Sequence, residues 1–111
     1  MKTEKRILKL TITRKWADAI INGGKLEEYR EISPFYHPRM WLKTNAASIK
    51  REYDEIHFFV GKPFMSYDHP HFKVKWNGFY IGNGKPEWGA KPGTSYYCID
   101  VSEILEVKFW M

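Results

Sequence analysis

Three charged residues and a glycine in the first third of the chain stand at a spacing that suits ligand binding. Gly23, Lys25, Glu28 and Arg30 follow the pattern G-x-K-x-x-E-x-R. In an extended segment, side chains two residues apart point to the same face, so Glu28 can orient Arg30. An arginine fork suits a phosphate or the edge of a base, and Lys25 can reach the same place. The pattern therefore indicates a site for an anionic or polar planar ligand.

The same charges allow two further interpretations. Arg30 lowers the pKa of a neighbouring lysine, which can then act as a base, whereas Glu28 raises that pKa. Alternatively, the charges form a solvated ion-pair cluster on a surface strand, since such pairs are common and weak. The segment 25–32 favours a functional site, because it places charges between Leu26 and Ile32 on a half-apolar face. Burying a carboxylate there is costly without a partner, and broken patterns tend to mark functional sites.

Apolar patterns and turn signals predict the elements that position these residues. A helix is expected after Thr13, its N-cap, and ends at Gly23-Gly24, while a short second helix is expected over 39–45. Strands are expected at 7–12, 25–32, 56–60, 72–81 with a bend at Gly78, 96–101 and 105–110. Five or six strands in so short a chain suggest a small β-barrel, which leaves no exposed sheet edge. The predicted fold class is α+β, a barrel flanked by one or two short helices.

Length and composition limit the class of protein. The chain has 111 residues, 43% of them hydrophobic, which predicts one domain over residues 1–111 and excludes a disordered chain. No apolar run approaches the ~20 residues of a membrane span. The N-terminus lacks the apolar stretch of a signal peptide. The single cysteine, Cys98, excludes an internal disulfide and favours a reducing compartment. We therefore expect a cytoplasmic protein without a membrane partner; nothing in the sequence indicates its oligomeric state.

An excess of basic and aromatic residues points weakly towards nucleic acid. The net charge is +5, and Trp, Tyr and Phe make up 17% of the chain. Basic residues near the N-terminus can contact phosphates or remain solvated: Lys2, Lys5, Arg6, Lys9, Arg14 and Lys15. Most aromatic residues between 58 and 80 are expected in the core: Phe58, Phe59, Phe64, Tyr67, Phe72, Trp76, Phe79 and Tyr80.

Two further aromatic residues are candidates for contact with a ligand. Trp88 lies in a Gly/Pro-rich loop, 82–94, where it can stack on a base or pack over the end of the barrel. Tyr29 lies between Glu28 and Arg30 in the sequence, and we expect it to stack on the ligand or to form a wall of the site.

The sequence predicts neither a metal nor a cofactor. The four histidines, at 37, 57, 69 and 71, and the single cysteine fit no zinc-binding spacing. Pro70, between two of these histidines, limits their convergence. Cys98 lies in the apolar segment YYCID, where a buried and inert thiol is expected.

Over roughly residues 7–107, the sequence resembles the ASCH family. The family signature G-x-K-x-x-E-x-R stands here at 23–30, after a strand and a Trp-containing helix. The stretch 30–36, REISPFY, is similar to an aromatic tail of bacterial and phage members, and 84–90, GKPEWGA, is similar to a second family loop. The resemblance implies a PUA-like β-barrel with a cleft, lined by the motif, that binds RNA or a nucleotide.

The resemblance also implies two enzymatic activities. Some family members hydrolyse N4-acetylcytidine with the motif lysine and a threonine nucleophile, and Glu28 stands here in place of that threonine. A glutamate cannot replace a hydroxyl nucleophile, although it can act as a general base for water. For the ribonuclease activity proposed for the family, Lys25, Glu28 and Arg30 would supply a base and phosphate clamps. We therefore expect RNA or nucleotide binding; the alternatives are a small hydrolase acting on modified nucleosides or RNA, and a protein-interaction module.

Overall fold

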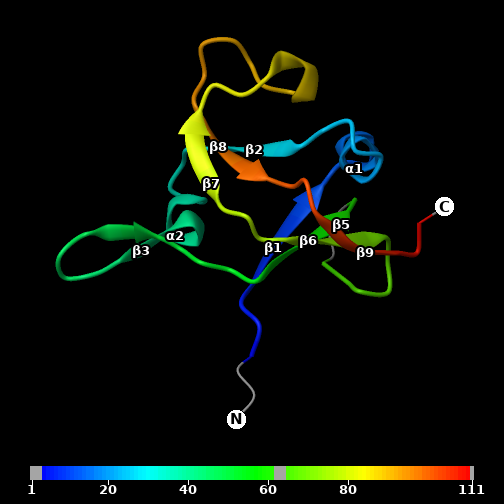
Figure 1. Cartoon of the computed structure of the whole chain (residues 1–111), viewed down its shortest axis with the longest axis horizontal. Coiled ribbons are helices and arrows are strands. Elements are labelled where there is room, and N and C mark those ends of the chain that lie inside the picture. Colours follow the sequence, from blue (N-terminus) through cyan, green and yellow to red (C-terminus); the bar gives the residue numbers. More distant parts are fainter. Residues whose placement is uncertain (1–3, 62–64, 111) are drawn as a thin grey trace.

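The computed structural model describes residues 4–61 and 65–110, which form an α+β fold. Within these ranges, nine strands lie in three sheets (Figure 1). The largest sheet, ordered β1-β5-β6-β9, contains β1 (Ile7–Ile12), β5 (Glu55–Val60), β6 (His71–Lys75) and β9 (Ile104–Lys108). The second sheet, ordered β2-β8-β7, contains β2 (Glu27–Glu31), β8 (Tyr96–Asp100) and β7 (Phe79–Gly82). β1 and β5 are parallel, and the other strand pairs are antiparallel.

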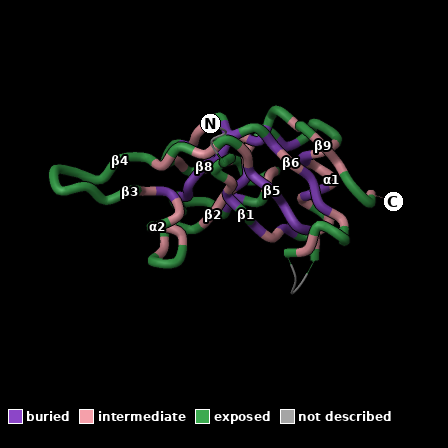
Figure 2. Tube along the Cα trace, turned by 90° about the horizontal axis from the view of Figure 1, so that it is seen from below, coloured by how far each residue is buried: buried purple, intermediate pink, exposed green. Residues whose placement is uncertain are grey.

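The predicted strands lie close to their expected positions, but five or six is too few. β3 (Trp41–Lys43) and β4 (Ser48–Lys50) form a further hairpin that projects from the body (Figures 1 and 2). Its residues are almost all exposed, so the hairpin lacks the alternation by which strands are recognised. Gly78, with φ of 87°, divides the predicted strand 72–81 into β6 and β7, which belong to different sheets.

The first helix, α1 (Arg14–Ile21), leads directly into the motif. Its N-cap is Thr13, as predicted, but the threonine side chain makes no capping hydrogen bond. The helix buries Ala17 and Ile20 and ends where Gly23 takes φ of 81°, a left-handed conformation that favours glycine. The second helix, α2 (His37–Met40), is shorter and earlier than the predicted 39–45, because β3 begins at Trp41.

The two larger sheets are not joined by strand pairing into one closed barrel. Among the described residues, β1 is an edge of the first sheet and β2 is an edge of the second. The guanidinium of Arg30, on β2, donates a hydrogen bond to the carbonyl oxygen of Thr11, on β1. A side chain therefore connects the two sheets at this point, where a closed barrel would pair its strands.

A shared core lies between these sheets. It includes Leu10 and Phe58 from the first sheet and Phe79 and Tyr97 from the second. In Figure 2, purple segments follow β1, β5 and β8. Most of the predicted core aromatics are buried: Phe58, Phe59, Phe72, Trp76 and Phe79. Tyr67 and Tyr80 are exposed instead, and Phe64 lies outside the described residues.

The single cysteine lies inside the second sheet. Cys98 is fully buried, as predicted, and burial raises the pKa of its thiol. β8, which carries it, is buried along nearly its whole length.

None of the helices in residues 4–61 and 65–110 has the length and apolar character needed to cross a bilayer.

Candidate functional site

Glu28 joins Lys25 and Arg30 in one buried cluster. Its Oε1 atom lies 3.2 Å from Lys25 Nζ, and its Oε2 atom lies 2.6 Å from Arg30 Nη2. The exposed fractions of the three side chains are 1% for Lys25, 8% for Glu28 and 12% for Arg30. A carboxylate that leaves water needs charged or hydrogen-bonded partners, and here it has two cations. This geometry does not fit the solvated surface cluster that the sequence also allowed.

Lys25 is the most enclosed of the three. Its ammonium group donates a hydrogen bond to the carbonyl oxygen of Trp88 and lies 4.4 Å from the centre of the Trp16 ring. Burial lowers the pKa of Lys25, and the neighbouring Glu28 opposes that effect. Lys25 therefore forms an ion pair with one oxygen of Glu28, on the side away from Arg30. Its hydrogen bond to Trp88 connects the loop of Trp88 to the start of β2.

Arg30 is held by partners from three segments. Nη2 donates to Thr11 O at 2.8 Å as well as to Glu28, and Nη1 donates to the Tyr36 hydroxyl at 3.1 Å. Nε is buried and has no hydrogen-bond partner among the described residues. The plane of the guanidinium is thus fixed before any ligand arrives.

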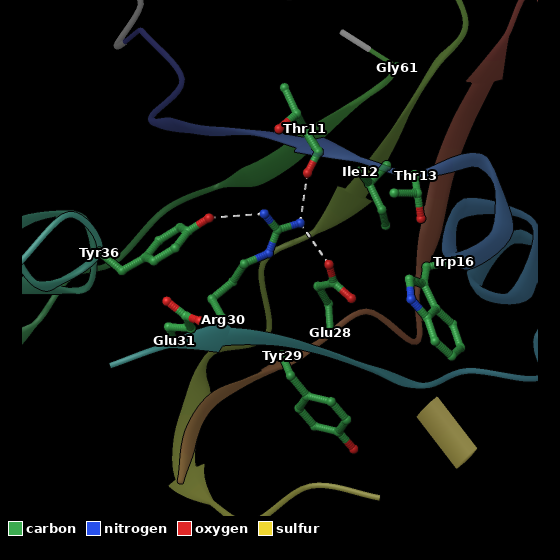
Figure 3. Close-up of a pocket in the computed structure, with 10 residues that line it drawn as sticks. All are labelled: Thr11, Ile12, Thr13, Trp16, Glu28, Tyr29, Arg30, Glu31, Tyr36 and Gly61. Atoms are coloured by element: carbon green, nitrogen blue, oxygen red, sulfur yellow. Dashed lines mark hydrogen bonds and ion pairs between the residues drawn. The ribbon is translucent and has the colours of Figure 1, made fainter. Parts of the chain in front are cut away.

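A cavity of about 400 Å³ opens beside Glu28 and Arg30. We call it the Trp16 pocket; it is lined by Thr11, Ile12, Thr13, Trp16, Glu28, Tyr29, Arg30, Glu31, Tyr36 and Gly61. Figure 3 shows Trp16 on one side of the Glu28 carboxylate, and Tyr36 on the far side of the Arg30 guanidinium. The volume lies within the range of small-molecule sites, and Lys25 does not line this cavity.

Tyr29 lines the edge of the cavity, but its ring is directed away from the charged pair. The Tyr29 ring projects from the face of β2 opposite to Glu28 and Arg30 (Figure 3). Its hydroxyl donates to Glu27 Oε1 at 2.9 Å and accepts a hydrogen bond from the Lys85 backbone N–H, also at 2.9 Å.

Trp88 and Gly23 lie at the loop and turn behind Lys25. Trp88 ends the 3₁₀-helix η1 (Pro86–Trp88), and its indole N–H donates to Gly24 O at 2.7 Å. This contact packs the loop against the end of α1. Gly23 is exposed and shapes the turn that leads to Lys25. Neither Trp88 nor Gly23 lines the Trp16 pocket.

Three residues of the site were not identified as such from the sequence. Trp16 was predicted only as part of the apolar stripe of α1, and Thr11 contributes a backbone carbonyl, which leaves no signal in a side-chain pattern. Tyr36 falls in the stretch REISPFY, which resembles a family feature. That stretch was the one signal from which Tyr36 could have been proposed.

The basic residues near the N-terminus are mostly engaged elsewhere. Lys5 pairs with Glu55 and Arg6 with Asp54, at 2.8 and 3.8 Å. Arg14 pairs with Asp18 at 3.1 Å, and the ammonium of Lys15 lies 4.6 Å from the centre of the Trp16 ring. Lys2 lies outside the described residues.

The chemistry available in the Trp16 pocket is recognition by hydrogen bonds and ring contacts. A carboxylate has about four lone-pair positions, so Glu28 can accept further hydrogen bonds besides those of its two cations. In the part of the chain that the structure describes, no three His, Cys, Asp or Glu side chains are grouped to hold a metal ion. Comparison with protein-family models, with curated proteins and with solved structures finds no match for this chain.

Proposed function

We propose that this chain binds RNA or a nucleotide, with a base seated in the Trp16 pocket. The observation that carries the proposal is the pairing of Glu28 with Arg30 at 2.6 Å on the wall of a cavity of about 400 Å³. A carboxylate accepts hydrogen bonds from the exocyclic amino group of a base, and a guanidinium donates to its carbonyl and ring nitrogen atoms. Aromatic rings such as those of Trp16 and Tyr36 provide stacking surfaces.

We also propose that the chain belongs to the ASCH family and has an open PUA-like barrel. The signature residues Lys25, Glu28 and Arg30 meet in one cluster, which supports a common role for them. The two larger sheets enclose one core, and Arg30 bridges their edges at Thr11. This arrangement is what a barrel opened between β1 and β2 would have.

Binding is tested by titrating the protein with short mixed-sequence single-stranded RNA and with nucleoside monophosphates at low salt. We expect saturable binding by calorimetry and an affinity for RNA that falls as salt is added, because phosphate contacts release counterions. Glu28→Gln and Arg30→Lys each weaken binding about tenfold, since each removes part of the recognition of the base edge. Glu103→Gln, at an exposed position outside the pocket, is the matched control and keeps the wild-type affinity.

Each protein is first checked for the wild-type circular dichroism spectrum, because Glu28 and Arg30 are also structural partners. The absence of binding to every RNA and nucleotide at low salt would overturn the proposal. Equal loss of affinity in Glu103→Gln would show that the effects of the other two variants are not specific to the pocket.

A second candidate function is hydrolysis of a modified nucleoside or of RNA. The lowered pKa of the buried Lys25 favours it, because such a lysine can take up a proton. The geometry favours it less than binding, since Lys25 is enclosed and both oxygens of Glu28 already face a cation. Incubation with N4-acetylcytidine and with labelled RNA tests it. No turnover by the wild type, or equal turnover by Glu28→Gln, contradicts this second function.

A further inference from the structure

A second cavity continues the Trp16 pocket on the other side of Arg30. It has a volume of about 390 Å³ and shares three lining residues, Thr11, Arg30 and Tyr36, with the first cavity. We call it the Arg39 pocket; its remaining lining residues are Ile7, Leu8, Lys9, Leu10, Phe35, Arg39, Tyr53 and Met65. The two cavities therefore adjoin along the Arg30–Tyr36 contact, at the edge of β1.

The two pockets differ in the charged residues that line them. The Trp16 pocket is lined by two carboxylates, Glu28 and Glu31, and by one cation, Arg30. The described lining of the Arg39 pocket contains Lys9, Arg30 and Arg39 and no carboxylate. Amino groups of a base suit the first pocket, whereas an anion suits the second, where lysine and arginine can bind phosphate oxygens.

Lys9 and Arg39 carry positive charges that no described carboxylate compensates, although Lys9 Nζ also lies 5.5 Å from the centre of the ring of Tyr67, which does not line this pocket. Among the residues that the structure describes, neither side chain forms an ion pair with a carboxylate. Arg39 Nη1 donates to Phe35 O at 2.6 Å, and its guanidinium lies 3.9 Å from the centre of the Phe35 ring. These contacts fix the side chain but occupy only one of its five N–H donors.

We propose that the Arg39 pocket binds the phosphate group of a nucleotide whose base occupies the Trp16 pocket. The ligand is then a nucleoside phosphate, not a free nucleoside, and Arg30 and Tyr36 lie at the point where base and phosphate diverge. This inference rests on the proposed function and deepens it. The phosphate can be that of a free nucleotide or that of a link in an RNA strand, since both present the same anionic oxygens.

The test compares cytidine and adenosine with their monophosphates and with the dinucleoside phosphates CpC and ApA, by calorimetry on the full chain. We expect the wild type to bind the phosphorylated ligands about tenfold more tightly than the nucleosides, because hydrogen bonds between charged groups are strong. In the double variant Lys9→Gln/Arg39→Gln, the ratio of nucleoside Kd to nucleotide Kd falls towards one. The control, Lys75→Gln/Lys91→Gln, removes two exposed charges outside both pockets and keeps the wild-type ratio.

The outcomes separate this inference from the proposed function. Equal affinity of the wild type for nucleosides and phosphates overturns the inference and leaves base binding intact. An unaltered ratio in Lys9→Gln/Arg39→Gln also overturns it, because the preference then arises elsewhere. Binding of none of the ligands contradicts the proposed function itself. Where the preference is present and is lost in the double variant, tighter binding of the diester identifies a strand as the source, and tighter binding of the monoester a free nucleotide.

Discussion

At the scale of single residues, Glu28 is the centre of the site. Its two oxygens hold Lys25 and Arg30 in a region almost closed to water, and both cations depend on it for charge compensation. Removing one partner of a buried pair leaves an uncompensated charge, which is strongly destabilising. The cluster is therefore both a recognition surface and a structural link between β2, the loop of Trp88 and the edge of β1.

The lowered pKa of Lys25 predicts a pH dependence of stability. In the folded protein, burial places the pKa of Lys25 below its ordinary value of 10.5. At a pH between the folded-state pKa and 10.5, the unfolded chain therefore binds more protons than the folded protein does. The contribution of Lys25 to the free energy of unfolding must then rise with pH over this range. We expect the difference in free energy of unfolding between wild type and Lys25→Met to move in favour of the wild type as the pH rises towards 10.5. Urea denaturation at a series of pH values measures it.

Other groups titrate in the same range, and the comparison removes their contribution. Burial raises the pKa values of Tyr29 and Cys98, which makes stability fall with rising pH in both proteins. Because both proteins retain these groups, their effects largely cancel in the difference. A difference that stays constant, or falls, over this range contradicts a buried ammonium at position 25.

At the scale of elements, the loop between β7 and β8 holds the site together from behind. Its helix η1 presents the Trp88 carbonyl to Lys25 and the Trp88 indole to Gly24. Gly89 ends η1 with φ of 101°, and a Cβ atom there would lie 2.9 Å from Cζ2 of Trp16. The backbone of the loop thus packs directly on a ring that lines the Trp16 pocket.

This packing predicts different effects for two glycine substitutions in the same loop. Gly93 also has a positive φ, 76°, but faces open space, so Gly93→Ala adds only backbone strain of about 1 to 2 kcal/mol. Gly89→Ala adds the same strain and a clash with Trp16, which costs about 1 to 3 kcal/mol more. The free energies of unfolding from urea titrations provide the measurement. Equal losses in the two variants would show that the loop does not press on Trp16.

At the scale of the whole molecule, one core serves both larger sheets. Phe72, at the centre of the first sheet, is fully buried and stacks on Phe58 at 5.0 Å between ring centres. Side chains from the second sheet, such as Tyr97, belong to the same core. The faces that the two sheets turn towards each other therefore lose their packing together.

We accordingly expect cooperative unfolding. The urea midpoints from tryptophan fluorescence and from far-ultraviolet circular dichroism coincide, because side-chain packing and strand pairing are lost together. Phe72→Ala lowers both midpoints equally and reduces the free energy of unfolding by about 3 to 5 kcal/mol. Two separate transitions, or a Phe72→Ala effect on one signal only, would contradict a shared core.

Local patterns in the sequence were sufficient to predict most of the helices and strands and part of the candidate site. Alternating apolar residues predicted β1 and β6, a compact apolar run predicted β5, and Gly23 marked the end of α1, because these signals act within a few residues. The two-residue spacing of Glu28 and Arg30 predicted that their side chains meet, and they do. The hairpin of β3 and β4 could not be predicted in this way, since an exposed hairpin needs no apolar alternation.

How the site is closed, and which cavities lie beside it, depends on contacts between segments that are far apart in the sequence. Lys25 meets a carbonyl oxygen 63 residues away, and Arg30 meets that of Thr11, 19 residues away; backbone acceptors leave no trace in residue types. The two adjoining pockets are each lined by segments that lie far apart in the sequence; the charged lining residues of the second pocket are all cations, whereas two carboxylates line the first. Sequence spacing determines which side chains share a face, whereas the packing of distant segments determines which face becomes a cavity.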